Sequence, residues 1–142
     1  MNVIGQKFQP IAAIATTPTA AKLLQPICQT LEATLWIPNF CQKTVNLSLN
    51  TQVYTDSLKN HLVNIWPDYN AIIFSLASGA VVRLISPLLQ DKYHDPAVVV
   101  LDEAGKFVIS LCSGHQGGAD KLTNILAPLL NALQLLQAHL II

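Results

Sequence analysis

The residues best suited to chemistry lie in two glycine-containing turns, each of which follows a short apolar run. Ser78-Gly79 follows the run 71–76, and the stretch 113–118 follows the run 107–111. Small residues let the backbone approach a ligand closely. A helix that starts after such a turn presents unpaired N–H groups, which favour carboxylates or phosphates. The two turns therefore predict a polar or anionic ligand, although neither has the spacing of a nucleotide-binding glycine motif.

The side chains in and after these turns make up the predicted site. His115 could act as a general acid or base near neutral pH, or its ring could simply cap a backbone carbonyl. Arg83 is the only arginine, and it could pair with a carboxylate of a ligand or with Asp91 or Asp95. The predicted catalytic residue is His115, and the predicted binding residues are Ser78, Gly79, Arg83, Ser113, Gly114, Gly117 and Gly118.

Other polar residues give weaker signals. Asp102 and Glu103 are adjacent in a tight turn, where both are expected to be exposed unless the tip of a hairpin folds over the site. Ser113 lacks a histidine and aspartate arrangement that would make it a nucleophile. The remaining histidines have no ligand spacing, so no protein metal site is predicted.

The elements that position these turns alternate between apolar strands and amphipathic helices. This alternation predicts an α/β protein with three layers, α/β/α, and a mostly parallel sheet. Strands are expected at about 10–15, 33–37, 71–76, 97–101, 107–111 and 138–142. Helices are expected at 18–32, 56–66 (after a Thr55 cap) and 81–89, and a last helix would place Leu122, Ile125, Leu126, Leu129 and Leu133 on one face. The pattern of the segment 39–54 is consistent with either an edge strand or a loop.

A short turn at Gly105 joins the runs 97–101 and 107–111 into a hairpin with one antiparallel strand. If both glycine turns are to face one ligand, the strands 71–76 and 107–111 must run parallel. The strand 97–101 would then be the antiparallel one. The sequence thus predicts a single site shared by both turns at one edge of the sheet, with Arg83 near that edge.

Composition limits the class of protein. The 142 residues are expected to form a single α/β domain, 1–142, that belongs to a longer protein. Only 11% of residues are charged, and basic and acidic side chains cancel, which argues against a nucleic-acid partner and suggests that another domain or subunit covers part of the surface. No apolar run has membrane-spanning length and no signal peptide is apparent. Three widely spaced cysteines fit the cytoplasm.

One block of the chain resembles a known family. It includes Ser78-Gly79 with Val82-Arg83, the run Asp95-Pro96-Ala97-Val98-Val99-Val100, and Ser113-Gly114-His115 with Gly117-Gly118-Ala119. This block is similar to the N-terminal domain of the CbiG family, the cobalt-precorrin-5A hydrolases of anaerobic cobalamin (vitamin B12) biosynthesis. The chain departs from the family pattern at Ser78, where Thr is usual, at Gln116, where Leu is usual, and at Asp120, where Asn is usual.

The resemblance implies an enzyme that opens the ring-A lactone of cobalt-precorrin-5A and releases acetaldehyde. Cobalt would be carried by the substrate, with no cofactor held by the protein. The implied partners are the corrinoid intermediate and a C-terminal domain of the same chain, which some members fuse to a precorrin methyltransferase, and the fragment alone is expected to be inactive. An alternative hypothesis is a non-catalytic module that docks the tetrapyrrole or braces the second domain. A generic nucleotide binder is a weaker third hypothesis, because the phosphate fingerprints are missing.

Overall fold

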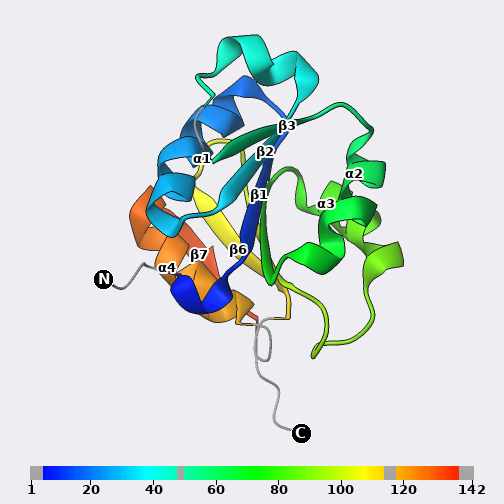
Figure 1. Cartoon of the computed structure of the whole chain (residues 1–142). Helices are drawn as coiled ribbons and strands as arrows, with labels where there is room; N and C mark the ends of the chain where they lie inside the picture. Colours follow the sequence, from blue (N-terminus) through cyan, green and yellow to red (C-terminus); the bar gives the residue numbers. More distant parts are fainter. Residues whose placement is uncertain (1–4, 48–49, 114–117, 138–142) are drawn as a thin grey trace, which may run out of the picture.

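The computed structural model describes residues 5–47, 50–113 and 118–137, and within them the strands form one sheet. The spatial order is β3-β2-β1-β4-β5-β6-β7 (Figure 1). The strands are β1 (Ile11–Ala15), β2 (Thr34–Pro38), β3 (Thr51–Tyr54), β4 (Ala71–Ser75), β5 (Ala97–Leu101), β6 (Phe107–Cys112) and β7 (Leu133–Leu135). The first five in chain order are parallel to one another, and β6 runs antiparallel to β5. The short β7 pairs with β6 in parallel.

Helices cover both faces of this sheet. Figure 1 shows α1 (Pro18–Leu31) and α4 (Ala119–Leu130) on one side, with α2 (Leu58–Ile65) and α3 (Ser78–Ile85) on the other. Every residue of β1, β4 and β5 is buried, as expected for central parallel strands with a helix layer on each face. The predicted three-layer α/β/α architecture, with a mostly parallel sheet and an antiparallel hairpin, is confirmed.

The alternation of side chains along each strand divides the core into two clusters. On the α1 and α4 face, Ile73 and Val99 pack with helix residues such as Leu24 and Leu122. On the α2 and α3 face, Phe74 packs in the same cluster as Leu62 and Val81. Because β-branched and aromatic residues suit a pleated surface covered on both faces, the strand predictions for these segments were correct.

The predicted strand directions were wrong at the hairpin. Ala97 donates its amide proton to the carbonyl of Asn70 at 3.0 Å, so β5 starts beside the start of β4 and runs parallel to it. The turn at Gly105, whose φ is +70°, then reverses the chain, and β6 is the antiparallel strand. The carboxyl ends of β4 and β6 consequently lie at opposite edges of the sheet. The error arose because helix α3 and the segment after it make a complete crossover, which returns the chain to the edge where β4 begins.

The last helix is shorter than predicted. Asn131 adopts a left-handed conformation and caps α4 after Leu130, so Leu133 lies in β7 and is 67% exposed instead of on the apolar helix face. A left-handed Asn is a common helix terminator. The strand predicted near 138–142 lies outside the described residues.

Two other boundaries differ from the prediction. Helix α2 starts at Leu58 with Ser57 as its cap, two residues after the expected Thr55, because the Ser57 hydroxyl accepts the amide proton of Asn60. The helix predicted over 81–89 is α3 followed by a 3-10 turn, Ser86–Leu88. Within 39–54 the chain forms a 3-10 helix, Asn39–Thr44, and then β3.

His61 on α2 is buried between aromatic rings. Its ring stacks on Tyr54 with centroids 4.4 Å apart and meets the edge of Trp36 at 4.5 Å. The Nε2 atom has no hydrogen-bond partner among the described residues. Burial lowers the pKa of His61 below its ordinary value, and the charge of Asp56 opposes this shift only in part. The folded protein therefore favours neutral His61.

We expect this burial to make stability depend on pH. Because the folded pKa lies below the unfolded value, the contribution of neutral His61 is complete above about pH 6.5 and is lost as the pH falls toward the folded pKa. The free energy of unfolding, measured with urea at about pH 7.5 and about pH 5.5, should fall on acidification. The variant His61→Phe keeps an aromatic ring and should show a smaller fall. Asn64→Ala, at an exposed position of the same helix, is the control and should keep the full fall. A fall of wild-type size in His61→Phe would contradict the prediction.

Candidate functional site

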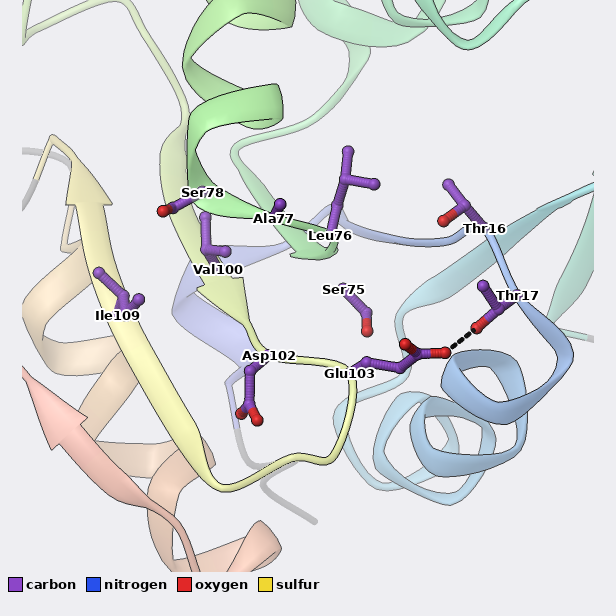
Figure 2. Close-up of a pocket in the computed structure, with 10 residues that line it drawn as sticks. All are labelled: Thr16, Thr17, Ser75, Leu76, Ala77, Ser78, Val100, Asp102, Glu103 and Ile109. Atoms are coloured by element: carbon purple, nitrogen blue, oxygen red, sulfur yellow. Dashed lines mark hydrogen bonds between the residues drawn. The ribbon is translucent and has the colours of Figure 1, made fainter.

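A crevice opens at the carboxyl ends of β1, β4 and β5. Its volume is about 450 Å³, and Figure 2 shows the residues that line it: Thr16, Thr17, Ser75, Leu76, Ala77, Ser78, Val100, Asp102, Glu103 and Ile109. From β1 the chain leaves through α1 to β2 on one side, whereas β4 lies on the other side of β1. The crevice therefore lies at the point where the strand order reverses, the usual ligand position in open α/β sheets.

Ser75, the last residue of β4, contributes a buried hydroxyl to the crevice. The residue is only 3% exposed, and its Oγ has no hydrogen-bond partner among the described residues. Buried hydroxyls are normally hydrogen-bonded, because an unpaired one loses its bonds to water without compensation. An unpartnered hydroxyl in the lining of a cavity indicates a place for a polar ligand atom or a water molecule.

The N-terminus of α3 borders the same crevice. Its cap position is Ala77, and no side chain in the described structure accepts a hydrogen bond from the first turn. Gly79 in this turn is not required by packing, since a Cβ added there would meet no atom within 4 Å and its φ is not positive. The first turn of α3 therefore offers amide donors next to open space.

The opposite side of the crevice is formed by the start of α1 and the tip of the β5–β6 hairpin. The Thr17 hydroxyl accepts the amide proton of Ala20 at 3.1 Å, which caps α1. The same hydroxyl donates to Oε1 of Glu103 at 3.0 Å (Figure 2). Thr17 therefore links the helix cap to the hairpin and holds the Glu103 carboxylate beside the crevice.

Asp102 shapes the hairpin tip. Its Oδ1 accepts the amide protons of Lys106 and Phe107, each at 2.7 Å, and its carbonyl accepts the amide proton of Gly105 at 3.0 Å. A Cβ on Gly105 would lie 2.7 Å from Leu23 of α1, so the tip sits close against that helix. The tip thus packs against α1 and forms one wall of the crevice, which Asp102 and Glu103 line.

The structure separates the predicted site residues. Ser78 lines the crevice and Gly79 is next to it, whereas Arg83 is exposed in the last turn of α3 and does not line it. Ser113 follows the far end of β6, where its hydroxyl lies 3.5 Å from the carbonyl of Asp95, just before β5 begins. The prediction of a single site shared by both turns is therefore wrong, since the antiparallel direction of β6 places its carboxyl end at the other edge.

The second turn lies only partly within the described residues. Gly114, His115 and Gly117 lie outside them, so their predicted roles stay predictions. Gly118 has a structural reason to be glycine, because its φ is +86° and a Cβ there would lie 2.7 Å from Phe8. Burial and the nearby Asp95 charge raise the pKa of the Cys112 thiol, which fits packing better than nucleophilic chemistry.

The crevice contains residues that the sequence analysis missed, namely Thr16, Thr17 and Ser75. One rule could have pointed to these residues: ligands bind beyond the carboxyl ends of parallel strands, at the point where the strand order reverses. Applying this rule requires the strand order, which the sequence does not provide. In the part of the chain that the structure describes, no group of three His, Cys, Asp or Glu residues could hold a metal ion. No described helix is long and apolar enough to span a membrane.

Comparison with known proteins places this fold and crevice in a family. The family model for the N-terminal region of cobalamin synthesis protein G matches residues 60–138, more than half of the chain. The chain belongs to this family, the CbiG N-terminal domain. The matched region includes β4, α3, the hairpin and α4, and hence all of the crevice lining except Thr16 and Thr17.

Two curated relatives and a crystal structure extend the comparison. A cobalt-precorrin-5A hydrolase from Priestia megaterium is 46% identical over 83 residues, 58% of this chain and 22% of that protein. A cobalt-precorrin-5A hydrolase from Salmonella typhimurium is 58% identical over 64 residues, 45% of this chain and 18% of that protein. A cobalamin biosynthesis protein G homolog from Sulfolobus solfataricus shares the fold, with a TM-score of 0.68 and 23% identity over 92% of this chain and 37% of that one. This chain thus spans about a fifth of the length of the two curated relatives.

The Thr17 cap gives a stability prediction for this CbiG domain. Thr17→Ala removes the acceptor for Ala20 and should lower the free energy of unfolding by about 1 kcal/mol. Thr17→Ser keeps the hydroxyl and should cost less. Thr30→Ala removes an exposed hydroxyl from the same helix and serves as the control, with a change of at most about 0.5 kcal/mol. Urea unfolding of the four proteins tests this, and equal stabilities for Thr17→Ala and the control would contradict it.

Proposed function

We propose that the protein containing this chain is a cobalt-precorrin-5A hydrolase, which consumes water to open the ring-A lactone and releases acetaldehyde. The observation that carries the proposal is that both curated relatives bear this enzyme name and are 46% and 58% identical over their matched regions. Lactone opening needs a base to activate water, donors for the developing negative charge and contacts that hold the substrate.

We propose that the crevice is where this domain contacts the corrinoid. A corrinoid is larger than a crevice of about 450 Å³, so only one edge of the macrocycle, with its substituents, would enter. The hydroxyls of Ser75 and Ser78 and the first turn of α3 suit the oxygen atoms of such substituents. Cobalt would arrive with the substrate, and the protein itself would hold no cofactor.

The division of work between domains is part of the proposal. Because the chain spans about a fifth of its curated relatives, the rest of the protein would complete the active site. We propose a C-terminal domain of the same chain as partner, in some family members fused to a precorrin methyltransferase. A cytoplasmic location fits the three widely spaced cysteines of the sequence. The alternative is that this domain only docks the tetrapyrrole or braces the second domain.

The direct test uses the full-length protein and the separate 142-residue chain. The full-length protein, incubated with cobalt-precorrin-5A under anaerobic conditions, should yield a lactone-opened product by mass spectrometry and acetaldehyde that can be trapped as a hydrazone. The separate chain should yield neither product. Absence of product with a folded full-length protein would refute the proposed function, and turnover by the separate chain would refute the shared active site.

His115 tests whether the second glycine turn takes part in catalysis. If His115 is the general base, His115→Ala in the full-length protein should lower kcat by about 100-fold or more, since positioned general bases contribute roughly this much. His94→Ala, at an exposed histidine, should leave kcat unchanged. Equal rates for the two variants would remove His115 from catalysis.

A further inference from the structure

We propose that the crevice is an acyl-hydrolysis subsite, in which the first turn of α3 and the Ser75 hydroxyl bind a neutral carbonyl oxygen and Glu103 activates the attacking water. The inference rests on the proposed function, because the lactone of the substrate would supply the carbonyl. It assigns a role to the first turn of α3 and to the Glu103 carboxylate, for which no catalytic role was predicted from the sequence.

The donors come from two independent features on the β4 side of the crevice. Among the described residues, no side chain caps the N-terminus of α3, and a Cβ on Gly79 in its first turn would meet no atom within 4 Å. Ser75, 3% exposed, adds a hydroxyl without any partner in the described structure. Fixed donors of this kind stabilise the charge that develops on a carbonyl oxygen during acyl transfer.

Gly79 supports the donor role of the first turn of α3, because packing does not require glycine at this position. Glycine inside a helix costs about 0.5–1 kcal/mol relative to alanine. Neither a positive φ nor a neighbouring atom requires glycine at this position. A missing side chain leaves the amides of the first turn accessible to a bound group.

The charge of the crevice selects the ligand. Asp102 and Glu103 both line it, and neither lysine nor arginine does. A ligand carboxylate would meet two like charges at close range, which disfavours it. A neutral lactone carbonyl does not meet this repulsion, and a water molecule can donate a proton to a carboxylate. The acidic side therefore favours an uncharged acyl group together with water.

Glu103 is better placed than Asp102 to act as the base. Asp102 uses Oδ1 to hold the hairpin through two backbone amides. Oε1 of Glu103 accepts a hydrogen bond from the Thr17 hydroxyl. No other hydrogen bond to this carboxylate is found in the described part of the chain. Thr17 is thus a positioning residue that fixes one carboxylate oxygen and leaves the other for water (Figure 2).

The step balances without any further reactant. Glu103 takes a proton from water as the water oxygen bonds to the lactone carbonyl carbon, and the carbonyl becomes an oxyanion held by Ser75 and the α3 amides. The oxyanion collapses, the bond between the acyl carbon and the ring oxygen breaks, and Glu103 returns the proton to the departing oxygen. The products are a carboxylic acid and a hydroxyl group, the sum of lactone and water.

The test of the base uses the full-length protein with cobalt-precorrin-5A. Glu103→Gln keeps the size and the bond from Thr17 but cannot take a proton, so kcat should fall by about 100-fold or more with little change in KM. Glu32→Gln is the matched control, since Glu32 is exposed at the other end of α1. Thr17→Val, which lacks the hydroxyl, should lower kcat and leave KM unchanged. Thr17→Ser, which keeps the hydroxyl, should retain the wild-type kcat.

The test of the donors separates binding chemistry from folding. Gly79→Ala should raise the melting temperature, because alanine favours the helix and meets no atom, yet should lower kcat/KM by about 10-fold. Ser75→Ala removes an unpartnered hydroxyl, so it should keep the melting temperature and also lower kcat/KM.

The outcomes distinguish the proposed function from the proposed acyl-hydrolysis subsite. If the wild-type protein opens the lactone and Glu103→Gln is within about threefold of it, Glu103 is not the base, while the proposed function stands. If Gly79→Ala and Ser75→Ala keep full kcat/KM, the donor assignment is wrong. If the folded wild-type protein does not act on cobalt-precorrin-5A, the proposed function fails and this inference fails with it.

Discussion

The rest of the structure depends on the burial of β1, β4 and β5 on both faces. Every residue of these three strands is buried, so a helix layer must cover each side of the sheet. The chain meets this requirement by sending α1 over one face and α2 and α3 over the other. Because the strand order reverses between β1 and β4, the helices that follow them leave in opposite directions and open the crevice.

A second constraint fixes the tip of the β5–β6 hairpin, which lies on the side of the crevice opposite α3. Gly105 has a positive φ and sits so close to Leu23 that a Cβ would lie 2.7 Å away, while Asp102 ties the hairpin through the amides of Lys106 and Phe107. These contacts bring the turn against α1, where Thr17 meets Glu103. A hairpin that the sequence presents as an exposed turn thus becomes part of the site through its packing on a helix distant in the chain.

The family comparison and the fold comparison cover different parts of the crevice. The family model spans 60–138 and includes Ser75, Ser78 and Glu103, whereas Thr16 and Thr17 precede it. The similarity to the Sulfolobus structure covers 92% of the chain and so shows that the whole α/β arrangement is shared. The part of the crevice formed by the start of α1 is therefore covered by the fold comparison alone, and the parts formed by β4, α3 and the hairpin tip are covered also by the family match.

The sequence by itself determined the layered α/β architecture, the runs that form β1, β2, β4, β5 and β6, and the family, because apolar runs and helical periodicity report local burial. It also placed Ser78-Gly79 at a ligand-type turn. It could not determine the direction of β6, which depends on how far the chain travels after α3, nor that Leu133 leaves the helix at a left-handed Asn131. Only the tertiary structure decided that Thr17, Ser75 and Glu103 line one crevice and that the second glycine turn follows a strand ending at the other edge. The physical reason is that strand order and direction arise from contacts between segments far apart in the chain, which no local pattern records.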